Sequence, residues 1–445
     1  MEHVIKIDFD TVMCDNFLGL NAVYHPFAVD ERLKAYGETA EDFERELERV
    51  KEANLKIARP YSDLSDNFQI PTLEKWCGAL KKIGVDVAIQ PSWGMRNSFK
   101  DGYSDQKLDE YAQRVCKNLS YLINDCGLDN IKYMVLYTEA TTVDDYPRPE
   151  GFTVWEYYVK VVRVLDEKLT ASGIRDKIKL VGPNNSERGR HLEDAVNELN
   201  DVLDIYSGHF YNYVHQWEWK RMCEDFQDIV KSSGKPFWLD EYGMQLEIFR
   251  ETPQYGTQLA LIAAASVAAG NQTSLLWTLF DQKFPNSDSN NIDSFHDGVH
   301  RWGLYHWEHD AIEDAGKPYP AWYAYCLMAN ALGGEKVSSV KSGEHFSTWQ
   351  EAAKYVVHAC AVKSESGYTI VVINQNACEE KVRIETGAKD ADLYRYSFEP
   401  WCNDGFYGTK KTPERIKLKN GVINDILPRG GFCVYRTDEL HKKYK

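Results

Sequence analysis

The feature that most constrains the fold is a strand-then-helix pattern that repeats eight times between residues 17 and 332. Each expected strand is a short apolar run. Each run is followed by a helical pattern, as in the helix expected at 39–53, where Phe43, Leu47 and Val50 share one face. The other strands and helices alternate in the same way along the chain: strands at 17–23, 54–60, 85–90, 131–139, 177–183, 202–211, 237–241 and 273–280, and helices at 71–83, 105–126, 151–172, 190–200, 217–232, 255–270 and 321–332. Eight such units predict an α/β fold, a closed (β/α)8 or TIM barrel.

An open, doubly wound sheet is the main alternative for alternating strands and helices. That fold commonly carries a glycine-rich dinucleotide-binding turn after its first strand, and no such turn follows residues 17–23. The sequence therefore favours the closed barrel.

The pattern changes after Gly333 and Gly334. Short alternating segments separated by Gly, Asn and Asp turns replace the helical periodicity, for example at 369–374 and 431–436. We predict a barrel domain over residues 1–334 and a small antiparallel β-sandwich over 335–445. The sandwich contains no pair of acids at strand ends, so we expect it to support the barrel rather than to carry chemistry.

Charge and composition exclude several classes of partner. The chain of 445 residues carries a net charge of -16, which argues against nucleic acid or an anionic membrane as a partner. No apolar run reaches the roughly 18 residues needed to span a bilayer. The ten cysteines are scattered without a C-x-x-C pair, and the N-terminus lacks a signal-peptide core. We therefore expect reduced thiols and a cytoplasmic location.

Two of the expected strands end in a glutamate. The strand at 131–139 ends at Glu139, and the strand at 237–241 ends at Glu241, shortly before Gly243. In a (β/α)8 barrel the C-terminal ends of the strands meet at one face and carry the active site. Two carboxyl groups are what cleavage of a glycosidic bond requires, one to protonate the leaving oxygen and one to attack or to activate water.

Further hydrogen-bonding and aromatic side chains fall at or near these strand ends. The candidates for binding substrate are Arg59, Trp93, Thr138, Asn184, His209, Tyr211, Trp277 and Trp302. Trp93 and Trp302 fit a buried core as well as a platform for a sugar ring. Asp240 is expected to be structural, because neighbouring side chains on a strand point to opposite faces. No metal-ligand cluster is visible among these residues, so neither a metal nor another cofactor is expected.

The arrangement resembles the retaining glycoside hydrolases of clan A. In that clan the acid/base glutamate ends the fourth strand and the nucleophilic glutamate ends the seventh. The resemblance covers about residues 15–335 and implies that Glu139 is the acid/base and Glu241 the nucleophile. It implies further that Arg59 contacts the nucleophile and that Tyr211 or His209 is its aromatic hydrogen-bond partner.

Two more positions are compared with the clan pattern. Trp277 matches the tryptophan that forms the floor of the subsite for the cleaved sugar. Thr138 departs from the pattern, because the clan usually has an asparagine there that contacts the sugar 2-hydroxyl, so no specific family is assigned.

The resemblance implies a carbohydrate substrate and a glycosidase that acts with retention of configuration. We expect a short oligosaccharide or glycoside, cleaved from one end. Two alternatives remain open at this point: a catalytically silent carbohydrate-binding barrel, and an inverting hydrolase. The separation of the two carboxyl groups distinguishes the last, because it is about 5–5.5 Å in retaining and roughly 6.5–9.5 Å in inverting enzymes.

Overall fold

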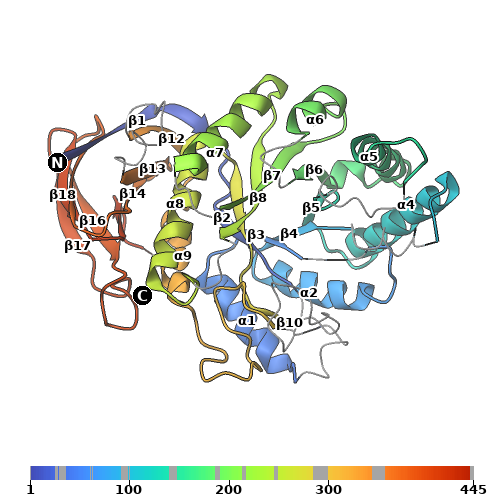
Figure 1. The fold of residues 1–445 in the computed structure, drawn as a ribbon, viewed down its shortest axis with the longest axis horizontal. Helices are drawn as coiled ribbons and strands as arrows, with labels where there is room; N and C mark the ends of the chain where they lie inside the picture. The colour runs from blue at the N-terminus through green and yellow to red at the C-terminus, as the bar shows by residue number, and fades with distance from the viewer. Residues whose placement is uncertain are drawn as a thin grey trace.

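The computed structural model describes residues 2–25, 29, 37–60, 62, 64–91, 99, 101–139, 148–185, 191–212, 217–244, 249–283, 299–342 and 356–440. A closed barrel of eight strands is ringed by helices, and a nine-stranded sheet packs against one side of it (Figure 1). None of the described helices combines the length and the apolar character needed to cross a bilayer.

The barrel strands are all parallel and follow one another in chain order, with the last pairing back onto the first. They are β2 (Leu20–Val23), β3 (Ile57–Arg59), β4 (Asp86–Ile89), β5 (Ile131–Val135), β6 (Lys179–Asn185), β7 (Ile205–Asn212), β8 (Phe237–Met244) and β9 (Thr273–Leu276). The predicted (β/α)8 barrel is confirmed. A two-stranded ribbon, β10 (Gln282–Lys283) with β11 (Val299–His300), follows the last strand.

The described helices cover the outside of the barrel. They are α1 (Ala40–Glu52), α2 (Ile70–Lys82), α4 (Asp105–Ser120, continued by a π-helical turn at Tyr121–Asp125), α5 (Val154–Ala171), α6 (Leu192–Glu198), α7 (Trp217–Val230), α8 (Pro253–Ala269) and α9 (Pro320–Ala331). Two of the starts are fixed by capping boxes, Thr39 with Asp42 in α1 and Thr153 with Glu156 in α5. The expected helices therefore lie where the periodicity placed them.

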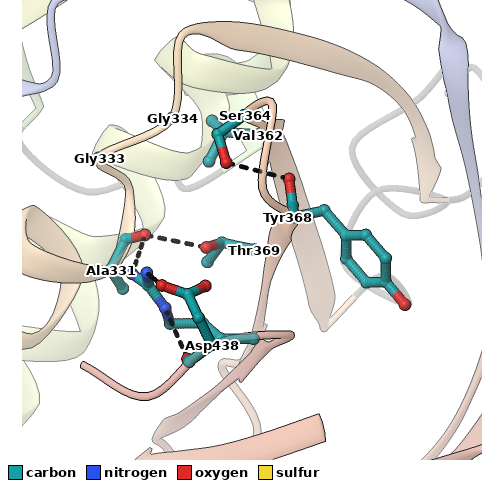
Figure 2. Close-up of a pocket in the computed structure, with 10 residues that line it drawn as sticks. Ala331, Gly333, Gly334, Val362, Ser364, Tyr368, Thr369 and Asp438 are labelled. Carbon is teal, nitrogen blue, oxygen red and sulfur yellow. Dashed lines mark hydrogen bonds and ion pairs between the residues drawn. The ribbon is translucent and has the colours of Figure 1, made fainter. Parts of the chain in front are cut away.

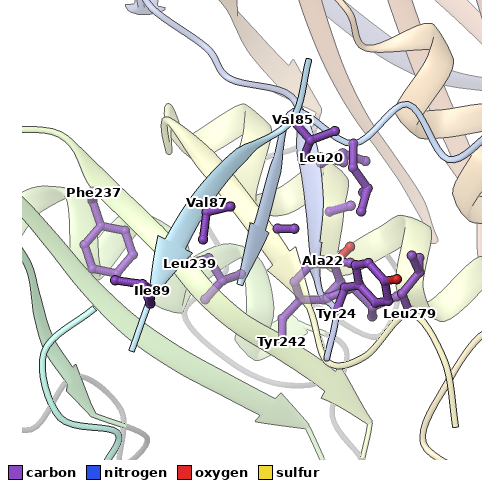
Figure 3. Packing of buried hydrophobic residues seen from close by; sticks show 14 of the residues in the cluster. Leu20, Ala22, Tyr24, Val85, Val87, Ile89, Phe237, Leu239, Tyr242 and Leu279 are labelled. Atoms are coloured by element: carbon purple, nitrogen blue, oxygen red, sulfur yellow. The ribbon is translucent and has the colours of Figure 1, made fainter. Parts of the chain in front are cut away.

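Barrel side chains alternate between an outer and an inner core. Val87 of β4 and Leu239 of β8 point outward into the layer between strands and helices (Figure 3). Their neighbours Ala88 and Trp238 belong to the smaller inner cluster, where Trp238 packs on Tyr133 with ring centroids 4.6 Å apart. This packed interior closes the barrel, so chemistry is confined to the ends of the strands.

The second sheet is a single nine-stranded sheet that curls around its own core. Its order is β17-β16-β19-β14-β13-β12-β1-β15-β18. The strands are β1 (Glu2–Cys14), β12 (Lys336–Ser342), β13 (Val357–Lys363), β14 (Tyr368–Asn374), β15 (Glu380–Glu385), β16 (Ala391–Phe398), β17 (Glu414–Leu418), β18 (Val422–Leu427) and β19 (Phe432–Arg436). On β13, Ala359 and Ala361 face the inner core of the sheet, while Cys360 and Val362 pack against the barrel side.

The N-terminal strand differs from expectation. β1 pairs antiparallel with β12 and parallel with β15, so it lies in the second sheet although it precedes the barrel in the chain (Figure 1). The division of the chain at residue 334 stays a prediction, but the first 14 residues do not form part of the barrel. The β1–β15 pair is also the one parallel pair among the described strands of this sheet.

Helices α8 and α9 connect the two parts. α8 contacts α9 on one side and β12, β13 and β14 on another, which explains why this Ala-rich helix is buried almost all round. At Gly256 a Cβ atom would lie 2.8 Å from Ala324 of α9 and 2.9 Å from the Phe398 ring of β16, so only glycine fits this approach. At the end of α9, the Ala331 carbonyl accepts hydrogen bonds from Thr369 (3.0 Å) and Arg436 (2.8 Å), at the edge of a small pocket (Figure 2).

Candidate active site

Glu241 lies near the C-terminal end of β8 and is held from two sides. Arg59, the last residue of β3, donates from Nη2 to Oε1 at 2.6 Å. Tyr211 of β7 donates its hydroxyl to Oε2, also at 2.6 Å. Arg59 and Glu241 are nearly inaccessible, with 1% and 3% of their surface exposed. The two donors therefore hold both oxygens of this buried carboxylate in place.

A β-bulge turns Glu241 into the barrel mouth. Gly208 of β7 pairs with Leu239, but the next residue, His209, pairs with Glu241, so Asp240 is an extra residue in β8. Simple alternation would place Asp240 inward with Trp238 and would turn Glu241 toward the helices. Because the bulge adds one residue, both acids face inward.

Glu139 lies in a turn rather than at the end of a strand. β5 ends at Val135, so the strand expected at 131–139 is shorter than predicted. Tyr137 and Glu139 have φ angles of 58° and 49°, in the left-handed region. The Glu139 N–H donates to the Asn184 carbonyl of β6 at 2.9 Å, which fixes this turn against the neighbouring strand.

His209 lies between the two glutamates. Its Nδ1 is 2.8 Å from Glu139 Oε1 and 3.2 Å from Glu241 Oε2. One carboxylate oxygen of each glutamate and a ring nitrogen of His209 all lie within 4.8 Å of one another. The nearest oxygens of the two glutamates are thus closer together than the roughly 6.5–9.5 Å between the carboxyl groups of an inverting glycosidase.

Asp240 lies beneath this group, and its expected orientation was wrong. The carboxylate is fully buried, accepts a hydrogen bond from Asn184 Nδ2, and lies 3.8 Å from Arg59 and 3.7 Å from His209 Nε2. The expectation failed because the bulge cancels the alternation on which it rested. Burial raises the pKa of Asp240, although the charges of His209 and Arg59 oppose this effect.

His209 is itself perturbed. Burial lowers its pKa, but the charge of Glu241, the hydrogen bond to Glu139 and the charge of Asp240 together outweigh burial, so the pKa is raised above its ordinary value. The imidazolium form is therefore favoured where three carboxylates surround one ring. Together with Arg59 it gives the site two buried positive groups.

Aromatic rings border the site at the end of β9. Trp277 is 8% exposed, and its ring centroid lies 5.8 Å from that of Trp302. His25, which follows β2, meets Trp277 edge to face at 5.8 Å. The structure thus brings two of the three predicted tryptophans, Trp277 and Trp302, together at the end of the strand next to β8.

The remaining predicted residues have different outcomes. Asn184 is turned down onto Asp240, and its Oδ1 is buried without a hydrogen-bond partner among the described residues. Thr138 Oγ1 is likewise buried without such a partner in the described part of the chain. Trp93 lies outside the described residues.

Two functional neighbours were not predicted as site residues. Gln90 Oε1 accepts from both Nε and Nη2 of Arg59 at 3.3 Å, which orients the guanidinium toward Glu241. Its place at the end of β4 was a usable signal. That Asp240 faces the same side as Glu241 had no such signal, because a bulge cannot be recognised from the alternation of the sequence.

The trio Glu139, His209 and Glu241 offers donor atoms of the kind that metals bind. The Glu241 oxygens, however, already accept from Arg59 and Tyr211. A cation would have to approach next to a buried guanidinium, so the arrangement is better suited to acid–base and nucleophilic chemistry.

Comparison with known proteins places the fold. No protein-family model matches the sequence, and no curated protein matches it either. Among solved structures, a glycoside hydrolase family 30 endoxylanase from Clostridium papyrosolvens is similar, with a TM-score of 0.65 and 13% identity over 98% of this chain and 100% of the other. A family 39 β-xylosidase from Caulobacter crescentus (TM-score 0.61, 13% identity) and an arabinofuranosidase (0.64, 17%) match over 98% of this chain and 100% of theirs. At these identities the likeness shows the fold, and it confirms the barrel-and-sheet architecture implied by the resemblance to clan A.

Proposed function

We propose that this chain is a glycoside hydrolase that cleaves an O-glycosidic bond with net retention of configuration. The single observation that carries the proposal is the approach of Glu139 and Glu241 to within 4.8 Å on either side of His209. Arg59 and Tyr211 donate to Glu241, whereas the more exposed Glu139 lies against His209, so the two acids have different environments, as the two roles require.

In the first step, Glu241 attacks the anomeric carbon. A bond forms between that carbon and a Glu241 oxygen, the bond to the leaving oxygen breaks, and Glu139 transfers its proton to that oxygen. In the second step, Glu139 takes a proton from water, the water oxygen bonds to the anomeric carbon, and Glu241 is released. Glu139 is suited to exchange protons because its side chain is 30% exposed, against 4% for Glu241.

For the substrate we propose a short glycoside of a pentose, in the xyloside or arabinofuranoside class. Three structures with this fold are described as an endoxylanase, a β-xylosidase and an arabinofuranosidase, which supports this class. The adjacent rings of Trp277 and Trp302 are suited to contact the apolar face of a sugar.

The proposal is tested with nitrophenyl glycosides of xylose, arabinofuranose and glucose. We expect hydrolysis of at least one pentoside and loss of several orders of magnitude in rate for Glu241→Ala, because the covalent route disappears. NMR of the first product formed should show the anomer of the substrate. A matched 2-fluoro glycoside should label Glu241.

Other outcomes would contradict specific parts of the proposal. Binding of sugars without hydrolysis of any glycoside would identify a silent carbohydrate-binding barrel. Formation of the opposite anomer would exclude retention, and a label on another carboxylate would exclude Glu241 as the nucleophile.

A further inference from the structure

A second group of buried acids lies at the rim of the barrel. Glu38 and Asp42 precede and begin α1, and they face His309, which follows β11. One carboxylate oxygen from each acid and one ring nitrogen of His309 lie within 4.8 Å of one another. The two segments follow β2 and β9, neighbouring strands of the barrel, so the group lies on the same face as the candidate active site.

Each of the three side chains is fixed by a neighbour. Trp307 Nε1 donates to Glu38 Oε1 at 2.5 Å, and Arg45 donates to Asp42 Oδ1. His309 Nε2 is 3.0 Å from Asp42 Oδ2. Asp42 Oδ2 also accepts from the Thr39 N–H at 2.7 Å, so the oxygen of this group without a hydrogen-bond partner among the described residues is Glu38 Oε2. Outer contacts of this kind orient the side chains of metal sites.

Glycine at position 37 supports this orientation of the imidazole. Gly37 has a φ of 100°, and a Cβ there would lie 3.1 Å from His309 Nδ1. The backbone therefore packs directly behind the Nδ1 edge of the ring, and Nε2 is the nitrogen that meets the acids.

Glu38 has an unsatisfied oxygen. Its Oε2 is buried without a hydrogen-bond partner among the residues that the structure describes, and the residue is only 7% exposed. Burial raises the pKa of Glu38, and the charge of Asp42 adds to this effect. An unpartnered carboxylate oxygen in such a place costs free energy unless a cation or a donor meets it.

The charged side chains around this group are also mostly acidic. Glu46, one turn further along α1, is buried beside the group, and burial and the charge of Glu38 raise its pKa. Arg49 and Arg45 approach from one side, but both contact Glu308 as well. The acids therefore outnumber the described cations around His309.

We propose that Glu38, Asp42 and His309 form a binding site for a divalent cation, of which zinc is the representative. One imidazole and two carboxylates are a donor set that zinc accepts, with water completing the coordination. Calcium prefers six to eight oxygen ligands, which this group does not provide among the described residues. His309 is 30% exposed as a side chain, which gives an ion a route from solvent. A bound ion would tie α1 to the segment after β11.

The test is calorimetric titration of metal-free protein with zinc chloride. The parent carries Glu241→Gln, so that the similar trio of the candidate active site does not compete. We expect one zinc per chain in the parent, and an affinity at least tenfold weaker when His309→Ala or Glu38→Gln is added. Glu38→Gln keeps an acceptor for Trp307, so it remains informative if His309→Ala fails to fold. His191→Ala is the matched control, because His191 makes a similar surface contact with Asp194 at 2.6 Å but has no second acid beside it in the described part of the chain.

The outcomes separate clearly. Tight zinc binding that the two site variants weaken and the control does not would support the proposal. No binding by the parent, or equal binding in all variants, would overturn it. Calcium binding as tightly as zinc would contradict the proposal that the imidazole of His309 is a ligand, because calcium prefers oxygen ligands.

Discussion

Replacing Arg59 by methionine tests how much the buried guanidinium stabilises the protein through its contact with Glu241. Methionine keeps most of the length and apolar volume of the side chain but removes the guanidinium. Arg59 donates to Glu241 Oε1 and to the Asp240 carbonyl, both at 2.6 Å, and lies 3.8 Å from the Asp240 carboxylate. The substitution therefore removes the nearest fixed cation from two buried carboxyl groups.

The magnitude follows from burial. Removal of one partner from a buried ion pair costs about 3–5 kcal/mol, because the other charge stays buried and uncompensated. Arg59 is 1% exposed and Glu241 3%, so solvent cannot replace the guanidinium. We expect the free energy of unfolding to fall by about 3–5 kcal/mol.

A double-mutant cycle isolates the charge effect. In a Glu241→Gln background one of the two carboxylates is neutral, so Arg59→Met should cost about 1–3 kcal/mol less than in the wild-type background. Urea unfolding followed by circular dichroism measures all four proteins. Arg163→Met is the matched control: its contacts with Asp201, at 2.9 and 3.2 Å, lie at the surface, and its loss should cost about 1 kcal/mol or less.

The reasoning fails if Arg59→Met costs the same with Glu and with Gln at position 241. That result would mean that the arginine stabilises the barrel through Gln90 and the backbone, not through the charge of Glu241. A loss no larger than that of Arg163→Met would show that the pair is not buried as described.

Three further outcomes are expected. Glu139→Ala should reduce turnover by about 10²–10⁴-fold on glycosides with poor leaving groups but should leave turnover of glycosides with highly activated leaving groups largely unchanged. When azide is added, the variant should form a glycosyl azide of retained configuration. An equal loss of turnover on both classes of glycoside would exclude the acid/base role. The pKa of His209 is raised above its ordinary value of 6.5, so His209 should make the protein more stable than His209→Asn. This difference in stability should be complete below pH 6.5 and should be lost as the pH rises through the raised pKa. A difference in denaturation midpoint that does not depend on pH would contradict this. Arg436→Met removes a donor to the Ala331 carbonyl and should lower the free energy of unfolding by about 1–3 kcal/mol with unchanged activity. The control Arg383→Met, at an exposed position, should change the free energy of unfolding little. Equal effects of the two variants in thermal melts would argue against a stabilising role for the contact between Arg436 and the end of α9.

Much of the barrel is predictable because its physics is local. Helical periodicity and caps such as Thr39 depend on residues a few positions apart, so the helices fall close to their expected bounds. Glu241, Arg59 and Tyr211 come together because the ends of parallel strands meet at one face.

The parts that differ depend on pairing between distant segments. β1 belongs to the second sheet because it pairs with β12 and β15, which lie more than 300 residues further along the chain. The alternation of apolar and polar residues within β1 does not indicate which strands it pairs with. Glu241 faces the same side as Asp240 because β8 bulges against β7, and the inserted residue is visible only in the register. Tyr137 and Glu139 adopt left-handed φ angles, and because neither residue is a glycine the sequence does not indicate this turn.

The proton inventory of the site links these differences to the proposed chemistry. Three carboxyl groups, those of Glu139, Glu241 and Asp240, surround two positive groups, Arg59 and a protonated His209. If all three acids were ionised, one negative charge would have no partner in a buried place, so one further proton is favoured there. Under the proposed function that proton is on Glu139, and His209, which lies between the two glutamates, can donate to either of them. In the proposed glycosylation step Glu241 would lose its charge to the covalent bond and Glu139 would gain one by giving up its proton, so the net charge around His209 would stay constant. Asp240 therefore contributes the third acid of this charge balance, and the bulge that turns Glu241 inward beside it brings the acids together around His209 and Arg59.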